Sequence, residues 1–172
     1  MKKEPLLISA CLLGIPCRYD GRSVEGRFGA ASLSLAAILP KLVERYELVP
    51  VCPEIYGGLP TPRTPSERVG ELVRMRDGRD VTQEYSRGAD AALSLCRTLG
   101  IRKALLKAKS PSCGVGRIYD GTFSGTLTDG DGVTAERLKG AGIAVFCECD
   151  LEGLLDEEKR PSLDADVAFL PK

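Results

Sequence analysis

Short apolar runs alternate with stretches of helical periodicity along this chain of 172 residues, and no other feature constrains the fold as strongly. The apolar runs lie at residues 6–10, 47–51, 104–106 and 143–146. Apolar residues at helical spacing occupy residues 31–46, 81–99 and 134–140. Because strands and helices in alternation form parallel sheets with right-handed crossovers, we expect an α/β fold with a mainly parallel sheet between flanking helices. This is a Rossmann-like three-layer arrangement, and the length predicts a single domain over residues 1–172.

Proline, glycine and aspartate mark where these elements bend or end. Pro40 must kink or restart the helix at 31–46, and Pro50 favours an edge position or an early end for the second strand. Residues 53–65 contain four prolines and two adjacent glycines, which predicts a shaped loop without a periodic element.

Further signals lie in the second half of the chain. Asp80, with Gln83 as its capping-box partner, predicts a helix start, and Gly100 predicts the helix end. The Asp-Gly pair at 120–121 predicts the turn of a small β-hairpin. The charged stretch at 156–160 is expected to pack on the surface.

The charge balance and the absence of histidine exclude several functions. Lys and Arg total 24, as do Asp and Glu, so nothing indicates binding to DNA or to a membrane surface. No apolar run approaches the roughly 18 residues that span a bilayer. Without histidine, Ser/His and Cys/His catalysis and His-ligated metal sites are excluded. Seven scattered cysteines favour a reducing compartment, so we expect a cytoplasmic protein that acts on a small uncharged molecule.

Three cysteines, Cys11, Cys52 and Cys113, each follow one of the first three apolar runs. If these runs are neighbouring parallel strands, the three thiols meet at one edge of the sheet, where α/β folds bind their ligands. Three thiolates can hold zinc or an iron-sulfur cluster and leave one metal position open for substrate. The alternative is that these small side chains simply pack at strand ends, and no CxxC pair is present to decide between the two.

The other four cysteines carry weaker signals. Cys96 lies on the apolar stripe of its helix, and Cys147 and Cys149 lie at the end of the last strand, so packing is the favoured interpretation for all three. Cys17 follows Pro16 in the first loop and is near enough in sequence to Cys11 to replace it as a ligand.

Polar residues on the same loops are candidates for catalysis and for substrate binding. Glu54 stands two residues after Cys52, where a carboxyl shielded from water would suit proton transfer, although a solvated loop glutamate would look the same. Ser110 and Ser112 precede Cys113, and their hydroxyls either orient a substrate or cap backbone groups. The candidates for binding a planar amide-like ligand are Arg18, Asp20 and Arg63, for which a surface ion pair is the alternative.

Seven motifs, taken in their order along the chain, resemble those of one family. It is a bacterial domain formerly of unknown function to which the thiouracil desulfidases belong. The motifs are SACLLG at 9–14, RYDG at 18–21, CPE at 52–54, GGLPTPR at 57–63, DGRDVT at 77–82, SPSCG at 110–114 and YDGTF at 119–123. The resemblance covers about residues 6–147, and this many motifs in order are highly specific for the family.

The resemblance implies a 4Fe-4S cluster held by Cys11, Cys52 and Cys113, with a fourth iron that takes the thiocarbonyl sulfur of a thionated nucleobase. It implies a non-redox reaction in which that iron acts as a Lewis acid, water attacks the carbon, and the thiocarbonyl becomes a carbonyl. By the same resemblance Glu54 shuttles protons and Ser110 positions the substrate. The chain lacks the additional C-terminal domain of some thiouridine-processing relatives, so a free base or nucleoside is the expected substrate.

Two other functions remain open from the residues alone. The three thiolates with a bound water describe a zinc hydrolase equally well. A single reactive thiol among seven would describe a binding or sulfur-carrier module. Iron content and multiple turnovers separate these alternatives from a desulfidase, provided that air has not destroyed the cluster.

Overall fold

A parallel sheet forms the centre of the computed structural model, which describes residues 3–24 and 30–155. Within these residues the sheet has four strands in the order β2-β1-β5-β8. Their bounds are β1 Glu4–Ser9, β2 Tyr46–Val51, β5 Lys103–Leu106 and β8 Ala144–Cys147. All three pairings are parallel, with Leu6 opposite Leu48 and Leu105 opposite Phe146. The α/β fold with a mainly parallel sheet is therefore confirmed.

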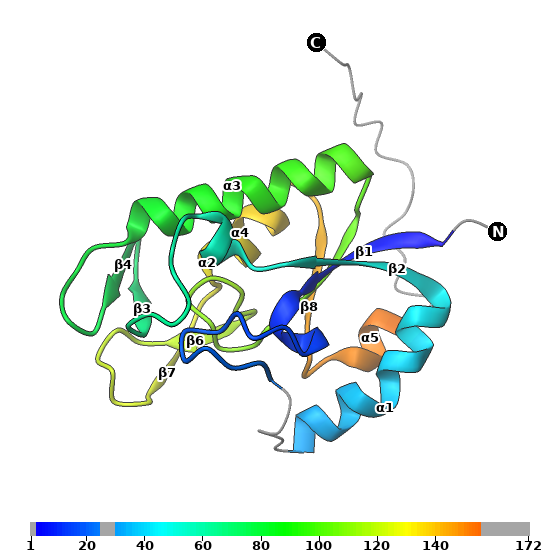
Figure 1. Cartoon of the computed structure of the whole chain (residues 1–172), viewed down its shortest axis with the longest axis horizontal. Helices are drawn as coiled ribbons and strands as arrows, with labels where there is room; N and C mark the ends of the chain where they lie inside the picture. Colours follow the sequence, from blue (N-terminus) through cyan, green and yellow to red (C-terminus); the bar gives the residue numbers. More distant parts are fainter. Residues whose placement is uncertain (1–2, 25–29, 156–172) are drawn as a thin grey trace, which may run out of the picture.

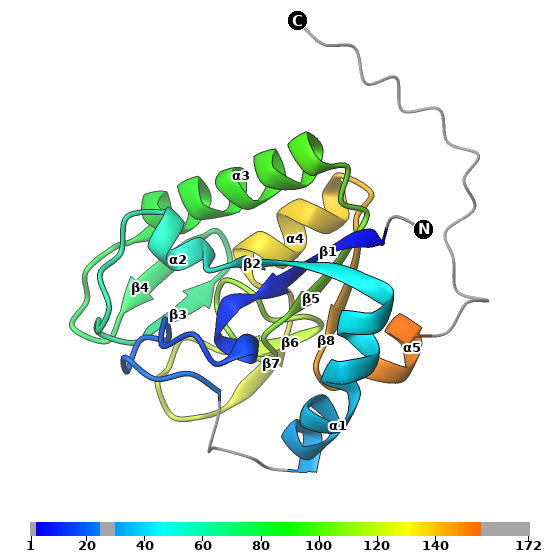
Figure 2. The ribbon, with the colours of Figure 1, turned by 45° about the vertical axis from the view of Figure 1, so that its right-hand side comes forward.

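Helices cover both faces of the sheet and complete three layers (Figure 1 and Figure 2). One face carries α1 (Ala30–Arg45) and α5 (Leu151–Leu155), and the other carries α3 (Thr82–Leu99) and α4 (Val133–Gly140). Successive side chains of a strand point to opposite faces of the sheet. In β1, Leu6 and Ile8 therefore pack in the core under α1, while Leu7 packs in the core under α3. All three are fully buried, which explains why β1 reads as a continuous apolar run.

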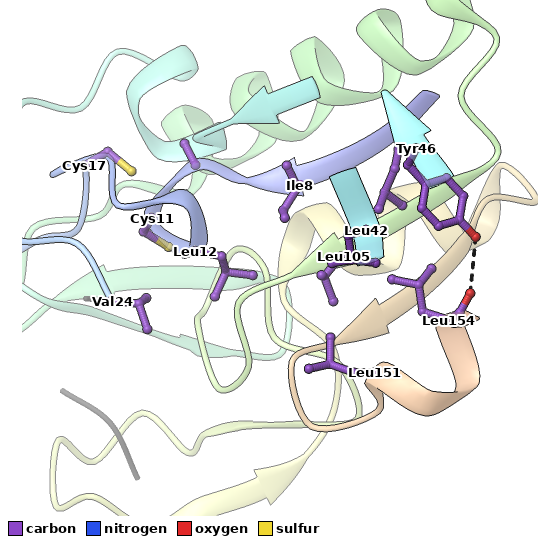
Figure 3. Close-up of a cluster of buried hydrophobic side chains, with 12 residues drawn as sticks. Ile8, Cys11, Leu12, Cys17, Val24, Leu42, Tyr46, Leu105, Leu151 and Leu154 are labelled. Atoms are coloured by element: carbon purple, nitrogen blue, oxygen red, sulfur yellow. Dashed lines mark hydrogen bonds between the residues drawn. The ribbon is translucent and has the colours of Figure 1, made fainter. Parts of the chain in front are cut away.

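The apolar core beneath α1 and α5 extends along the sheet from Tyr46 and Leu154 to the residues that follow β1 (Figure 3). At one end the Tyr46 hydroxyl donates a hydrogen bond of 3.2 Å to the carbonyl oxygen of Leu154. At the other end lie Cys11 and Cys17, beyond the last residue of β1. This apolar layer therefore leads directly to the cysteines that the sequence singled out.

Two antiparallel hairpins stand beyond the carboxyl ends of the parallel strands (Figure 1). The first, β3 (Ser66–Val69) with β4 (Leu72–Met75), was not expected from the sequence. The second, β6 (Arg117–Tyr119) with β7 (Leu127–Asp129), is the predicted small hairpin. Its connection is longer than an Asp-Gly turn, because the loop runs over residues 120–126 and is closed by a bond from Asp120 N to Thr126 O.

Several boundaries differ from expectation. The loop 53–65 begins with a short helix, α2 (Pro53–Tyr56), so the prediction of no periodic element there was wrong. Proline is well suited to the first turn of a helix, where its missing N–H costs nothing. A 3-10 helix, η1 (Ala10–Leu13), follows β1. Helix α1 continues through Pro40 as one element, so the helix does not restart there. Strand β2 lies at the edge of the sheet, as Pro50 predicted.

The capping prediction for α3 was wrong at the start of the helix and confirmed at its end. Val81 is the N-cap residue and has no side-chain cap bond, so Asp80 and Gln83 do not form the predicted capping box. Asp80 lies one residue earlier, where its carboxylate accepts a hydrogen bond of 2.9 Å from the Thr82 N–H and closes the turn that leads into the helix. Gly100 ends the helix in the left-handed region with φ +66°. The predicted surface stretch 156–160 lies outside the described residues. None of the helices in the described part of the chain combines the length and apolarity needed to cross a membrane.

Two glycines bring α2 against α3 and so fix the segment that carries Cys52 and Glu54. A Cβ atom at Gly57 would lie 1.9 Å from the Glu84 carbonyl oxygen, and one at Gly88 would lie 1.9 Å from the Pro53 carbonyl oxygen. The two backbones can approach this closely only because neither position has a side chain.

Gly88→Ala is expected to lower the free energy of unfolding by about 1–3 kcal/mol, because the methyl group must push Pro53 away. Helix propensity alone would predict a gain of up to about 1 kcal/mol. Gly140→Ala in α4 is the control, since a Cβ there meets no atom within 4 Å. Urea unfolding followed by circular dichroism measures both variants, and equal responses would contradict the close contact.

Candidate metal centre and substrate cavity

A cavity of about 370 Å³ lies beyond the carboxyl ends of β1, β2 and β5. We call it the strand-end cavity; its lining includes four cysteines and the side chains of several charged and aromatic residues. The four are Cys11, Cys17, Cys52 and Cys113. Its size is that of small-molecule sites, and its position is where open parallel sheets bind ligands.

Each of the three predicted ligands is placed by the element that follows its strand. Cys11 is the second residue of η1, immediately after β1. Cys52 separates β2 from α2. Cys113 lies in a turn after β5 that is closed by a 2.8 Å hydrogen bond from Gly114 N to Ser110 O. The structure thus brings together three thiols from three distant segments, and none of them is in a disulfide.

Cys17 lies closer to this group than its sequence position indicated. A hydrogen bond with the Cys11 thiol raises the pKa of Cys17 to about 11. A hydrogen bond with the Cys17 thiol, together with burial, raises the pKa of Cys52. The Cys52 thiol also donates to the Cys17 carbonyl oxygen at 3.7 Å. Cys17 therefore contacts both neighbouring candidates and is itself only 3% exposed.

Cys113 reaches the same cavity from the turn after β5. Burial raises the pKa of Cys113 to about 12, opposed by hydrogen bonds with the Ser9 and Ser112 hydroxyls. Ser9 is held in turn, since its hydroxyl oxygen accepts a 3.0 Å bond from the Lys107 N–H. Ser9 begins the SACLLG motif but was not predicted as a site residue, although it is the last residue of β1 and so lies at the same sheet edge.

The donor set of the cavity consists of thiols, the ligands that hold iron-sulfur clusters. In the described residues, no three Cys, Asp or Glu side chains converge to the spacing that one metal ion needs. A tetrahedral zinc site holds each thiolate about 2.3 Å from the same ion. A four-iron cluster instead spreads three thiolates over three different iron atoms, which sets them farther apart. Cys11, Cys52 and Cys113 come from three separate strand ends and line one cavity, so their donor chemistry fits such a cluster.

Glu54 lines the strand-end cavity and is held by Arg63. Arg63 Nε donates to Glu54 Oε2 at 2.7 Å, and the two side chains are only 3% (Arg63) and 14% (Glu54) exposed. Burial by itself would lower the pKa of Arg63, but the Glu54 carboxylate outweighs it and the pKa is raised. Burial, followed by the Glu54 charge, raises the pKa of Tyr85, another cavity residue, well above its ordinary value.

The remaining donors of Arg63 are directed to the loops around it. Its terminal nitrogens donate to the carbonyl oxygens of Cys17 and Pro60 and to the Thr61 hydroxyl, at 3.1–3.2 Å. Arg63 was predicted as a substrate-binding residue. In the structure it joins the loop after β1 to the loop after β2 and fixes the carboxylate of Glu54.

Arg63→Met is expected to lower the free energy of unfolding by about 3 kcal/mol, because it leaves the Glu54 carboxylate buried without its partner. Arg79→Met is the matched control, since Arg79 pairs with Glu84 on the surface with its side chain 60% exposed. A change within about 0.5 kcal/mol is expected there. Urea unfolding under anaerobic conditions compares the two, and similar losses would contradict a buried role for the Glu54–Arg63 pair.

The two serines before Cys113 have different surroundings. The Ser110 hydroxyl lines the cavity and accepts hydrogen bonds of 3.1 Å from the N–H groups of Ser112 and Cys113. Ser112 is 1% exposed, and its hydroxyl shares a 2.9 Å bond with Thr134 at the start of α4. Ser112 is not among the described residues that line the cavity, so only Ser110 faces a substrate space.

The loop after η1 presents Arg18 and Tyr19 to the cavity. Arg18 Nε donates to Asp20 Oδ1 at 3.3 Å, and the Arg18 guanidinium lies 5.6 Å from the Tyr19 ring centroid. Asp20 also accepts a 3.2 Å bond from the Arg22 N–H and is not among the lining residues. These contacts with Arg18 and Arg22 indicate that Asp20 shapes the loop that carries Arg18.

The other cysteines lie away from this site. Cys96 is 1% exposed in the core between α3 and the sheet, where burial raises its pKa to about 11. Cys147 Sγ accepts a 3.3 Å bond from Cys149 N after β8. None of these three is among the described residues that line the strand-end cavity.

Several cavity residues were not found from the sequence because they come from the two hairpins or their flanks. They are Glu67, Arg76, Tyr119, Phe123 and Gly125. Lys107, which follows β5 and forms an ion pair with the buried Glu148, also lines the cavity. Isolated charged and aromatic residues in short, irregular segments carry no periodicity that would place them. Only the YDGTF motif gave a signal for this region.

Comparisons with known proteins agree with this geometry. A family model described as 2-thiouracil desulfurase matches residues 6–150. The uncharacterized protein YbbK of Bacillus subtilis (strain 168) is 39% identical over 160 residues, covering 87% of this chain and 99% of YbbK. A solved structure named as the 4Fe-4S-dependent thiouracil desulfidase TudS is 50% identical, with a TM-score of 0.77. That match covers 89% of this chain and 96% of the TudS chain.

The family model begins within β1 and ends just past β8, so it covers nearly all of the sheet and all three strand-end thiols. The TudS structure agrees with this match in both sequence and fold. The chain belongs to the 2-thiouracil desulfurase family.

Proposed function

We propose that this protein removes sulfur from thionated pyrimidine bases such as 2-thiouracil, giving the oxo base and sulfide. The observation that carries the proposal is the meeting of Cys11, Cys52 and Cys113 at a cavity that also holds a buried acid. Membership of the 2-thiouracil desulfurase family and the name of the TudS structure support it. The reaction is a hydrolysis: water supplies the oxygen, the carbon–sulfur bond breaks, and no electrons are exchanged.

Cys11, Cys52 and Cys113 would hold a 4Fe-4S cluster, as the TudS name implies for that protein. When bound, the cluster supplies an open iron position that binds sulfur and acts as a Lewis acid on the C=S bond. Cys17 contacts two of these thiols and remains a reserve ligand.

The protein's own groups then handle the proton and the base. The Glu54 carboxylate, fixed by Arg63 and shielded from bulk water, accepts a proton from the attacking water and returns it to the departing sulfur. The Ser110 oxygen accepts two backbone bonds, and its O–H is available to donate to a substrate acceptor. Arg18 is a further donor on the cavity wall, while Asp20 and Ser112 hold the loops beside it.

The size of the strand-end cavity and the balanced charge of the chain agree with a small substrate. A cavity of about 370 Å³ has room for a free base or a nucleoside, and a balanced count of 24 basic and 24 acidic residues gives no footprint for DNA. Seven cysteines, none of them in a disulfide, support a reducing compartment such as the cytoplasm.

The test uses protein purified without oxygen and brought to full iron and sulfide content. Incubation with 2-thiouracil is expected to give uracil and sulfide in equal amounts, over many turnovers for each protein chain. Protein stripped of iron by a chelator and protein loaded with zinc serve as controls and should be inactive. A fully iron-loaded protein that forms no uracil would refute the proposal, activity of the zinc form would favour a zinc hydrolase, and a single turnover would favour a sulfur carrier.

A further inference from the structure

A buried carboxylate, that of Glu67, holds the loop between β6 and β7 against β3. Glu67 is 8% exposed, and its Oε2 accepts hydrogen bonds from the N–H groups of Gly121 at 2.8 Å and Phe123 at 2.9 Å. Bonds from backbone amides to a buried carboxylate are charge-assisted and strong. The carboxylate belongs to one hairpin and the amides to the other, so this contact sets where the loop 120–126 lies.

Contacts within the loop and with β3 also determine its shape. The Asp120 carboxylate accepts bonds from both the N–H and the hydroxyl of Thr122, at 3.0 and 2.6 Å. Gly121 approaches β3 so closely that a Cβ atom would lie 1.9 Å from Cγ2 of Val69. Phe123 has φ +57°, a conformation that bulky residues rarely adopt without support from their surroundings. The position of Phe123 is therefore closely determined.

The side chain that this loop places is the ring of Phe123, which lines the strand-end cavity together with the cysteines. The guanidinium of Arg76, at the end of the first hairpin, lies 5.5 Å from the ring centroid. The ring belongs to none of the three apolar core clusters of the described residues, either as a buried member or as a packed neighbour. Core packing consequently does not account for an aromatic residue held here.

We propose that Phe123 is the platform on which the flat ring of the thionated base stacks, and that Glu67 is the positioning residue that holds the platform in place. This proposal rests on the function proposed above and specifies how its substrate is selected. A nucleobase has two apolar faces, and aromatic side chains bind such faces by stacking. The platform therefore selects planar, aromatic thiocarbonyl compounds over non-planar ones that present the same C=S group.

Kinetics of cluster-loaded variants test this selection. Phe123→Leu keeps an apolar side chain but removes the aromatic face, and it is expected to raise KM for 2-thiouracil about tenfold while kcat changes much less. Phe123→Tyr keeps the aromatic face, so its KM for 2-thiouracil should remain near that of the wild type. For 5,6-dihydro-2-thiouracil, which has the same thiocarbonyl in a puckered ring, Phe123→Leu should leave KM almost unchanged. The preference for the planar substrate should thus fall by about tenfold.

Glu67 is tested by the same assay. Glu67→Ala removes the acceptor for two backbone amides and should raise KM for 2-thiouracil as Phe123→Leu does. Glu67→Gln retains a carbonyl oxygen at that place and should restore most of the affinity. Iron and sulfide content must equal that of the wild type in each variant, which excludes damage to the cysteine site.

A binding measurement gives an answer that does not depend on turnover. The chain has no tryptophan, so Phe123→Trp creates a single reporter at the platform. Uracil, the expected product, should quench its fluorescence in a saturable manner. Leu99→Trp is the control, because Leu99 is 46% exposed at the end of α3 and is not among the residues lining the cavity. That variant should show no saturable change.

The outcomes separate this proposal from the proposed function. If the wild type desulfurates 2-thiouracil but Phe123→Leu loses affinity for planar and puckered substrates alike, or for neither, the platform is refuted and the function stands. If the wild type forms no uracil, the proposed function fails, and the fluorescence of Phe123→Trp alone decides whether the platform binds a base. An unresponsive reporter at position 123 in active protein would also overturn the platform.

Discussion

Serine in place of Cys11, Cys52 or Cys113, introduced one at a time, is expected to abolish both the cluster and the desulfuration activity. The three thiols come from three strand ends and line one cavity, so each would hold a different iron atom. An alcohol oxygen is a poor ligand for iron-sulfur clusters, which are held by thiolates. Iron and sulfide analysis, the visible absorption of anaerobically purified protein and uracil formation should all fall to background.

The controls come from the remaining cysteines. Cys149→Ser changes an exposed thiol outside the cavity and should leave the cluster intact, as should Cys96→Ser in the core. Cys17→Ser is the informative comparison, since Cys17 contacts Cys11 and Cys52. If Cys11→Ser kept its iron while Cys17→Ser lost it, the ligand would be Cys17 and our assignment of Cys11 would be wrong.

Glu54→Gln is expected to lower kcat by about 10²- to 10⁴-fold with little change in KM or in cluster content. The amide has nearly the shape of the carboxylate and its oxygen can still accept from Arg63, but it cannot take up a proton from water. Glu84→Gln is a suitable control, because Glu84 also pairs with arginines and is not among the residues lining the cavity. Single-turnover rates on protein of known iron content measure the chemical step, and an unchanged rate in Glu54→Gln would exclude this residue as the proton carrier.

The parallel sheet and the meeting of the three cysteines could be predicted from the sequence because both follow from a general rule of parallel sheets. Strands such as β1 and β5, buried on both faces, show continuous apolar runs. The carboxyl ends of neighbouring parallel strands share one edge, so residues that follow them meet whatever their separation in sequence. Topology alone thus brought Cys11, Cys52 and Cys113 together.

The parts that could not be predicted are short or have polar residues on their inner side. The buried residue of β3 is Glu67, and a charged residue in a sequence is normally taken to be exposed to solvent. This strand therefore lacks the alternation of apolar and polar residues that would predict it. Helix α2 has four residues, fewer than two helical turns, and therefore shows no periodicity. The pairing of Glu54 with Arg63 crosses an irregular loop, where sequence spacing does not determine distance.

The order β2-β1-β5-β8 places the first strand of the chain between two partners that are synthesised much later. A chain emerging from the ribosome cannot bring the three thiols together until the segment that carries Cys113 has joined β1, so a cofactor held by all three can be inserted only after β5 has paired with β1. Each brown molecule in a preparation would then be one in which β1 and β5 had already paired.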